Sequence, residues 1–172
     1  NDNQMSIAEN HGGIYKNLSE LRESDGQAEN NLFKAMGYQY YFIKNGNDMK
    51  TLIDVFKKVK DTNCPVVVHI CTVKGKGCAF AEADGERFHW VRPFDLKTGS
   101  EKKPFLGERY DRIVRDYLMD KMKKDSKIIT ILAAVPDALS FSPDNRKLVG
   151  KQLIVVGIAE EHAIALAAGI AR

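Results

Sequence analysis

Two adjacent carboxylates and a histidine follow an apolar strand near the end of this 172-residue chain. Residues 152–157 (QLIVVG) lead into Glu160, Glu161 and His162, which open a run of small apolar residues. A side chain between the carboxyl end of a strand and the following helix lies where open α/β sheets bind ligands. Glu160 is therefore a candidate acid–base residue. The structural alternative is that acidic residues in a first helical turn only complement the helix dipole.

Oxygen-bearing side chains also open the chain, in the segment Asn1-Asp2-Asn3-Gln4-Met5-Ser6. A hard cation such as Mg²⁺ prefers oxygen ligands and commonly shares them with the phosphates of its ligand. The amide oxygen of Asn3 and the backbone carbonyl of Met5 could supply two neighbouring ligands from one loop. The same residue types are equally typical of a turn that binds no metal.

A lysine- and glycine-rich turn, Lys74-Gly75-Lys76-Gly77, follows a second apolar strand. Glycine lets a backbone approach an anion closely, and lysine would act as a point charge on a diphosphate. A basic surface turn is the structural alternative. His89 lies between two aromatic residues, a setting typical of partial packing as well as of catalysis. His69 lies within the strand and is expected in the core.

Helices that alternate with apolar strands must position these groups. Asp48 is expected to cap a helix whose apolar face contains Met49, Leu52, Ile53, Phe56 and Val59. The run VVVHICT is typical of a strand buried on both faces. The pattern indicates an α/β fold with parallel sheets and flanking helices. Strands are predicted at 38–43, 65–72, 128–134 and 154–157, and helices at 15–22, 29–36, 49–59, 110–122, 143–150 and from residue 160 onward.

Residues 91–107 contain two prolines and two glycines without periodicity, which predicts a linker between domains at 1–90 and 108–172. The chain does not begin with methionine. The helix from Glu160 is apolar on all sides, a pattern typical of burial. We therefore expect a piece of a longer protein, or a chain that requires partners to cover this helix.

The bulk composition excludes several classes of protein. A net charge of +3 is too small to indicate nucleic-acid binding. No apolar run reaches the roughly 18 residues that a membrane span needs, and no signal peptide is visible. The three cysteines, spaced by seven residues, match no common zinc pattern. These features predict a reduced, cytoplasmic chain that binds neither nucleic acid nor membrane.

Four stretches together resemble the 1-deoxy-D-xylulose-5-phosphate synthases, a family of the thiamine-diphosphate-dependent transketolase superfamily. They span almost the whole chain in the family's order. The resemblance implies two Rossmann-like α/β domains: the C-terminal part of a diphosphate-binding domain, followed by the N-terminal part of a pyrimidine-binding domain. The stretches are NDNQMSIAENHGG at 1–13, VVVHICTVKGKG at 66–77, FHWVRPFD at 88–95 and GKQLIVVGIAEEHAIALAAGIA at 150–171.

Thiamine diphosphate and Mg²⁺ are the cofactors that this resemblance implies. Asn3 matches the family's metal-binding asparagine, and Met5 matches the position that gives the metal a backbone carbonyl. Ser6 and Ile7 belong to the same cofactor-binding stretch. Lys74 matches a position that lines the diphosphate region of the cofactor.

The resemblance also implies two catalytic residues, His89 and Glu160. His89 matches a position beside the thiazolium ring. Glu160 matches the glutamate that shares a proton with N1′ of the aminopyrimidine, which promotes loss of the proton at thiazolium C2. Burial would raise the proton affinity of this glutamate. Glu161 stands where family members often have glutamine.

The implied activity is that of a transferase in isoprenoid and thiamine biosynthesis. It condenses pyruvate with glyceraldehyde 3-phosphate to give 1-deoxy-D-xylulose 5-phosphate and CO₂, and the family usually forms homodimers.

The family's Gly-Asp-Gly metal-binding segment and its third domain are not in this sequence, residues 13–32 are shorter than usual, and residues 132–140 depart from the pattern. We therefore expect a shortened, divergent member, inactive or nearly so as an isolated chain. A transketolase, a 2-ketoacid dehydrogenase component, and a non-catalytic scaffold or regulatory domain stay open as alternatives.

Overall fold

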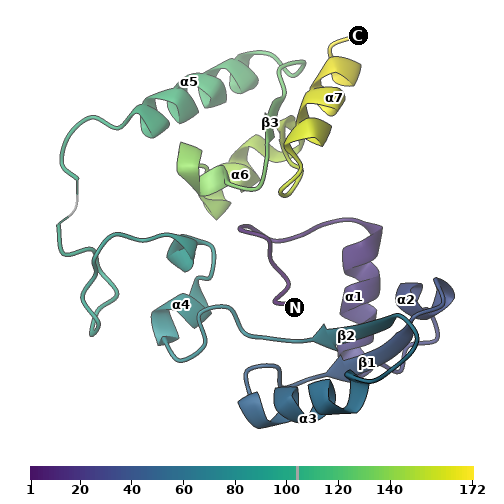
Figure 1. Ribbon diagram of the computed structural model, residues 1–172. Coiled ribbons are helices and arrows are strands. Elements are labelled where there is room, and N and C mark those ends of the chain that lie inside the picture. The colour runs from purple at the N-terminus through teal and green to yellow at the C-terminus, as the bar shows by residue number, and fades with distance from the viewer. Residues whose placement is uncertain (104) are drawn as a thin grey trace. The chain divides into compact units, whose positions relative to one another are not determined.

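The computed structural model describes residues 1–103 and 105–172, which form two compact units (Figure 1). The first unit comprises Asn1–Met5 and Asn10–Gly85, and the second comprises Ser6–Glu9 and Glu86–Arg172. The predicted linker at 91–107 includes residue 104, which lies outside the described residues. The predicted domain limits stay predictions.

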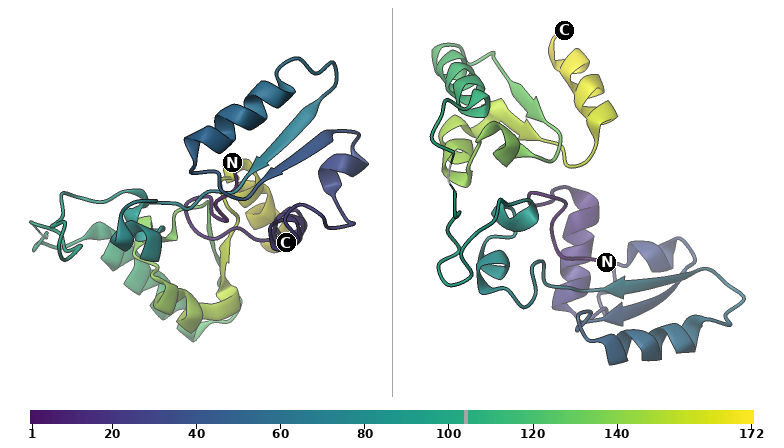
Figure 2. Two further views of the ribbon diagram at one scale, coloured as in Figure 1. Left: turned by 90° about the horizontal axis from the view of Figure 1, so that it is seen from below. Right: turned by 60° about the vertical axis from the view of Figure 1, so that its left-hand side comes forward.

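The first unit contains a parallel pair of strands with helices around it. Strands β1 and β2 pair in register from Gln39 with Val66 to Ile43 with Ile70. Figures 1 and 2 show α1 and α3 on opposite sides of these strands. The elements are α1 (Gly13–Glu23), α2 (Leu32–Ala35), β1 (Gln39–Ile43), α3 (Met49–Val59), β2 (Val66–Ile70) and α4 (Ala79–Ala83).

Local hydrogen bonds explain where two of these helices begin. The Asp48 carboxylate accepts from the Thr51 backbone N–H at 2.9 Å, so the predicted cap of α3 is confirmed. The Asn31 side chain accepts from the N–H groups of Phe33 and Lys34, so α2 begins three residues later than the sequence pattern predicts.

Helix α3 covers only part of its predicted apolar face, on which Leu52 and Val59 are half-buried. Val55 is buried on it, whereas Met49, Ile53 and Phe56 are exposed. Strand β2 is likewise only partly covered, since His69 is its single buried residue. The prediction of a strand buried on both faces is therefore wrong for this chain. Two strands with these few helices do not supply enough apolar surface to enclose either face.

The second unit has the same alternation with shorter strands. Strands β3 and β4 are parallel and pair from Thr130 with Leu153 to Leu132 with Val155. The Gln152 side-chain amide donates to backbone carbonyls in the last turns of α5 and just after it, at Met122, Asp125 and Ile128, which connects that helix to the start of β4. The elements are the 3₁₀ turn η1 (Arg87–His89), α5 (Tyr110–Lys124), β3 (Thr130–Leu132), η2 (Pro136–Leu139), α6 (Pro143–Val149), η3 (Gly150–Gln152), β4 (Leu153–Val155) and α7 (Glu160–Ile170).

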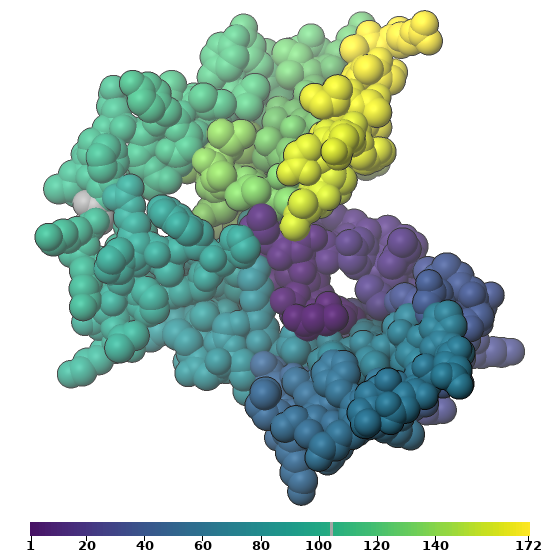
Figure 3. Space-filling view, in the orientation of Figure 1, coloured from purple at the N-terminus to yellow at the C-terminus, as the bar shows by residue number. Residues whose placement is uncertain are grey.

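Each unit has a small core of its own. Leu21 is fully buried in the first unit and Phe141 in the second. Helix α7, yellow in Figure 3, contributes no buried residue. Its Ile164 is 74% exposed. The burial that this apolar pattern predicts is not found among the described residues, and the expected partner or longer protein stays a prediction. No helix among the described residues combines the length and the apolar character that crossing a membrane requires.

Candidate functional site

The segment that begins the chain forms a tight turn around Asn3. The Asn3 amide oxygen accepts from the Met5 backbone N–H at 3.1 Å, and an Asp2 carboxylate oxygen accepts from the Gln4 N–H at 3.0 Å. Gln4 has a φ angle of 67°, in the left-handed region that non-glycine residues seldom adopt. An amide oxygen has two lone pairs, so the bond to Met5 leaves one for a cation.

Backbone pairing places this turn at the carboxyl end of β2. The Asp2 N–H donates to the Ile70 carbonyl at 2.7 Å, and the Thr72 N–H donates to the Asp2 carbonyl at 3.0 Å. The Thr72 hydroxyl also donates to the Asn1 side chain at 2.6 Å. Asn3 therefore lies just beyond a parallel strand, at the sheet edge where ligands bind in open α/β folds.

The side chains of Met5 and Lys74 both lie close to Gly85. A Cβ atom on Gly85 would lie 3.2 Å from the Met5 sulfur and 3.4 Å from the Lys74 Cδ. The structure thus brings two expected cofactor-binding residues together in the first unit. Because Gly85 has no side chain, both side chains can lie close to its backbone.

The glycines of the lysine-rich turn serve packing more than anion approach. Gly75 has a φ angle of 78°, and a Cβ atom there would lie 2.8 Å from the Ala81 carbonyl oxygen. The Gly77 N–H donates to Glu82 at 2.8 Å, so it is already used within the protein. Any contribution of this turn to phosphate binding therefore rests on Lys74 rather than on these glycines.

A buried ionic network beneath the turn is the feature that sequence reasoning missed. Asp2 Oδ2 accepts from Arg22 of α1 at 2.5 Å and from His69 Nε2 of β2 at 2.8 Å. With Nε2 donating, the Tyr40 hydroxyl donates to His69 Nδ1 at 2.5 Å. His69 is in the core as predicted, but as a hydrogen-bonded bridge. A histidine within an apolar strand was the one signal in the sequence.

The electrostatics of this network follow from burial and hydrogen bonding. Burial alone would raise the pKa of Asp2, but bonds from His69, Gln4 and Arg22 together hold that pKa below its usual value. Burial raises the pKa of Tyr40 to about 12, with the Cys71 and Asp2 charges adding to the effect. Burial, together with Asp2, also raises the pKa of the Cys71 thiol.

Asp2, His69 and Cys71 form a possible metal triad, because their ligand atoms lie within 4.8 Å of one another. The Arg22 guanidinium shares the same Asp2 oxygen, however, and its positive charge opposes a cation there. The carboxylate is already satisfied by protein donors. The arrangement therefore indicates a structural network, and Asn3 with Met5 remains the candidate metal-binding pair.

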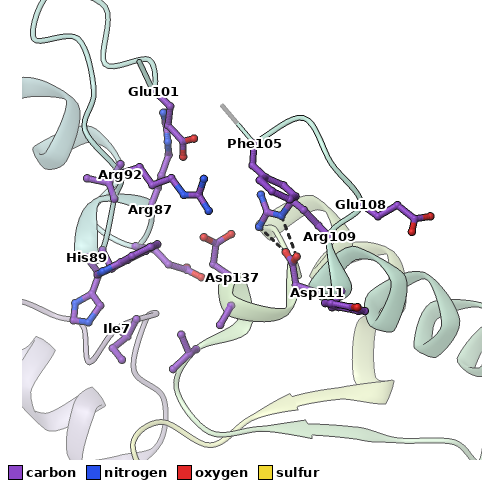
Figure 4. A pocket seen from close by; sticks show the side chains of 16 residues that line it. Ile7, Arg87, His89, Arg92, Glu101, Phe105, Glu108, Arg109, Asp111 and Asp137 are labelled. Atoms are coloured by element: carbon purple, nitrogen blue, oxygen red, sulfur yellow. Dashed lines mark hydrogen bonds and ion pairs between the residues drawn. The ribbon is translucent and has the colours of Figure 1, made fainter. Parts of the chain in front are cut away.

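In the second unit, Ile7 and His89 line one cavity of about 750 Å³ (Figure 4). Ile7 belongs to the short segment Ser6–Glu9, whereas His89 ends η1. Trp90 and Arg92 also line this cavity. The structure thus brings two expected site residues to one wall, although they are far apart in sequence.

Two ion pairs involve residues that line this cavity. Glu86 accepts two hydrogen bonds from Arg146 of α6, at 2.6 and 2.8 Å, which fixes the start of η1. Arg109 donates to Asp111 at 3.0 and 2.6 Å, and the Ser140 hydroxyl donates to the same carboxylate. The Arg109 hydrogen bonds are the main reason that the pKa of Asp111 lies well below its usual range. Its Glu86 partner raises the pKa of Arg146.

Glu160 is the first residue of α7, immediately after the turn at Gly157. Ser6 reaches this turn, since a Cβ atom on Gly157 would lie 3.9 Å from the Ser6 hydroxyl oxygen. Glu160 and Glu161 are both exposed. The expected burial of Glu160 is therefore not found in this chain, because α7 lacks neighbours that would cover it.

Asn3, Met5 and Lys74 thus belong to the first unit, and Ser6, Ile7, His89 and Glu160 belong to the second. The roles expected for all of them stay predictions.

Comparison with known proteins gives a consistent result. A family model described as 1-deoxy-D-xylulose-5-phosphate synthase matches residues 24–72. Proteins with that name from Clostridium tetani and Listeria monocytogenes are 32% and 35% identical to this chain, and each alignment includes 99% of it. A third, from Clostridium beijerinckii, is 34% identical over the same share. This chain belongs to the 1-deoxy-D-xylulose-5-phosphate synthase family.

The matched region is a limited part of these relatives. The chain spans about a third of the length of the curated relatives it matches, namely 33% of the Clostridium tetani protein and 29% of the Listeria protein. The first of these alignments extends over 207 residues, more than the 172 of this chain, so the relative has residues that this chain lacks within the aligned region.

Proposed function

We propose that this chain is part of a transferase that uses thiamine diphosphate and Mg²⁺ to condense pyruvate with glyceraldehyde 3-phosphate. The products are 1-deoxy-D-xylulose 5-phosphate and CO₂. One observation carries the proposal: a chain of this family keeps the Asn3–Met5 turn at the carboxyl end of a parallel strand, with Lys74 beside it. We place the enzyme in the cytoplasm, in isoprenoid and thiamine biosynthesis.

The residues present fit the proposed cofactors. An amide oxygen from Asn3 and a carbonyl oxygen from Met5 are the hard donors that Mg²⁺ prefers. Lys74 would hold the diphosphate, and a side chain at position 85 would crowd both Met5 and Lys74. Ser6 and Ile7 would contact the body of the cofactor.

The chemistry divides between the cofactor and the protein. Thiamine diphosphate supplies, when bound, a thiazolium carbon that attacks the donor's carbonyl and an electron sink for decarboxylation. Glu160 would hold a proton at N1′ of the aminopyrimidine. His89, on the cavity wall beside Ile7, would hold a proton at the carbonyl oxygen of the substrate, as general acid–base catalysis requires.

The exposure of α7 supports a homodimer as part of this proposal. The helix that carries Glu160 is apolar and has no buried residue in this chain. A second subunit or a further part of the enzyme would have to cover it before Glu160 could work in a site that excludes water. The dimer supplies that cover in the proposal.

Substitution of Glu160 tests the catalytic role. In the enzyme that contains this chain, Glu160→Ala should lower the turnover number by about a hundredfold or more, the usual range for loss of acid–base catalysis. Glu161→Gln is the matched control, since Glu161 is also exposed in the first turn of α7, and it should retain activity. Unchanged turnover in Glu160→Ala would instead favour a scaffold or regulatory domain.

Product analysis tests the substrates. CO₂ release from pyruvate without a ketose donor would exclude a transketolase. Identification of 1-deoxy-D-xylulose 5-phosphate as the product would exclude a ketoacid dehydrogenase component, which also consumes pyruvate. Absence of this product would contradict the proposed reaction while leaving the cofactor assignment in place.

Calorimetry tests the isolated chain. The family's Gly-Asp-Gly segment, which supplies a further metal ligand, is not among these 172 residues. Titration of thiamine diphosphate with Mg²⁺ into this chain should therefore show weak binding. Micromolar affinity would contradict the expectation that the further ligand is needed.

A further inference from the structure

We propose that the buried network of Asp2, Arg22 and His69 is a positioning device that holds the Asn3–Met5 turn ready for Mg²⁺. The metal-binding part of this inference rests on the proposed function, whereas the positioning part rests on geometry alone. In this proposal Arg22 and His69 act on the turn through the Asp2 carboxylate, and not by contact with the cofactor.

The two oxygens of Asp2 have different partners. Oδ1 accepts from the Gln4 N–H inside the turn at 3.0 Å. Oδ2 accepts from Arg22 at 2.5 Å and from His69 at 2.8 Å. A single carboxylate thus connects the turn to α1 and to β2. Without the partners of Oδ2 the carboxylate would rotate toward water, and Oδ1 would release the turn.

Burial makes these bonds strong. The side chains of His69, Asp2 and Arg22 are only 4%, 8% and 18% exposed. Water competes poorly at such positions, and a hydrogen bond with an ionised acceptor, such as the Asp2 carboxylate, is stronger than one between neutral groups. An Asp2 carboxylate that lost one donor would remain largely buried and under-satisfied, which favours local opening of the segment.

The turn needs this support because its backbone is unfavourable by itself. Gln4 adopts a φ angle of 67°, and such conformations persist where the surroundings hold them. The Met5 N–H bond to Asn3 orients the amide oxygen that would bind the cation. The position of the Asn3 amide oxygen therefore depends on the Asp2 carboxylate, which Arg22 and His69 hold in place.

Three substitutions around the His69 imidazole separate its bond to Asp2 from its bond to Tyr40. His69→Phe removes the donor to Asp2 and keeps an aromatic ring against Phe42, whose centroid lies 5.3 Å away. Tyr40→Phe removes the bond on the other nitrogen and leaves the Asp2 contact intact. His69→Gln restores an N–H donor near the position of Nε2 and should rescue the turn.

Hydrogen exchange measured by NMR on the ligand-free chain is the first readout. In His69→Phe the Gln4 and Met5 amides should exchange about tenfold faster or more, the effect expected for loss of a hydrogen bond to a charged group. Tyr40→Phe and His69→Gln should remain near the wild-type rates. Equal rates in His69→Phe and the wild type would overturn the proposal.

Amides of β1 and α3 report whether the first unit remains folded. If His69→Phe loses protection there as well, Arg22→Gln replaces it, because Arg22 contacts the other side of the same oxygen. Faster exchange confined to the turn in Arg22→Gln supports the proposal. Loss of protection throughout the first unit in both variants would assign the network to folding and overturn a positioning role.

Mn²⁺ binding followed by electron paramagnetic resonance is the second readout. The probe is millimolar Mn²⁺ with thiamine diphosphate, added to the wild type and to His69→Phe. Weaker uptake by the variant supports the magnesium role. Equal uptake by both overturns it. No uptake by the wild type would count against the proposed cofactor site, and the exchange measurement would then decide the positioning role separately.

Discussion

The two units attach their candidate site residues in different ways. In the first, the Asn3 turn is tied to α1 and β2 through one buried carboxylate, with partners 20 and 67 residues away from Asp2. In the second, Glu160 is set by a short strand, a glycine turn and an exposed helix. The Asn3 turn is thus held by buried contacts within the first unit, whereas Glu160 lies exposed at the start of α7.

The two units also differ in the length of their paired strands. Strands β1 and β2 pair over five residues each, and β3 and β4 over three. The second unit compensates with ion pairs between segments that are distant in sequence, of which Glu86 with Arg146 is the clearest. We therefore expect the first unit to respond most to changes in its buried network, and the second to changes in its core and ion pairs.

Truncation of a fully buried apolar side chain in each unit should have the largest effect. Phe141→Ala should destabilise the second unit by about 3–5 kcal/mol, and Leu21→Ala should destabilise the first by about 2–5 kcal/mol. Denaturant-dependent hydrogen exchange at β4 and β1 amides reads the units separately. Equal destabilisation of both units by either substitution would break the comparison, since it would mean that they share one cooperative core.

Removal of the Glu86 charge should have the next largest effect. The Glu86 and Arg146 side chains are 13% and 23% exposed, so Glu86→Gln leaves a partly buried guanidinium without its counter-charge. We expect a loss of about 1.5–3 kcal/mol in the second unit, as for hydrogen bonds to charged groups. Asp144→Asn, in an exposed pair with Lys147, should change stability by less than about 0.5 kcal/mol. Similar urea midpoints for the two variants would contradict this role.

Acid should weaken the second unit through Asp111. Its pKa is lower in the folded protein than the ordinary 3.8, because Arg109 and Ser140 donate to the carboxylate. The stabilisation is therefore complete above the unfolded pKa and is lost as the pH falls below it toward the folded pKa. Urea unfolding of the wild type and Asp111→Asn should differ at neutral pH and converge in acid. A difference that stays constant across this range would rule out the carboxylate as the cause.

The smallest expected effect concerns the cysteines of the first unit. Burial raises the pKa of the Cys71 thiol and restricts access to it, whereas Cys64 is exposed. Iodoacetamide should therefore modify Cys64 faster than Cys71, since the thiolate is the reactive form. Peptide mass mapping after timed quenching measures both rates. Equal rates would show that the network around Asp2 opens readily.

The sequence by itself determined the local features of this protein. Asp48 caps its helix as the sequence predicts, and the helix predicted from residue 143 begins there, capped by Ser142. The Asn3 turn forms where its residue types predict it. Parallel pairing and the order of helices and strands also follow the hydrophobic pattern. These features depend on hydrogen bonds and periodicities within a few residues, so a linear reading contains the necessary information.

Only the tertiary structure decided which distant groups meet. It joined Asp2 to His69, brought Gly75 against Ala81, turned α3 so that Val55 rather than Phe56 is buried, and left Glu160 exposed. Each outcome depends on the path of the whole chain and on how much apolar surface its neighbours can cover. The spacing of residues along the sequence reveals neither the path of the chain nor the apolar surface that its neighbours cover. Contacts between residues far apart in sequence are decided by packing.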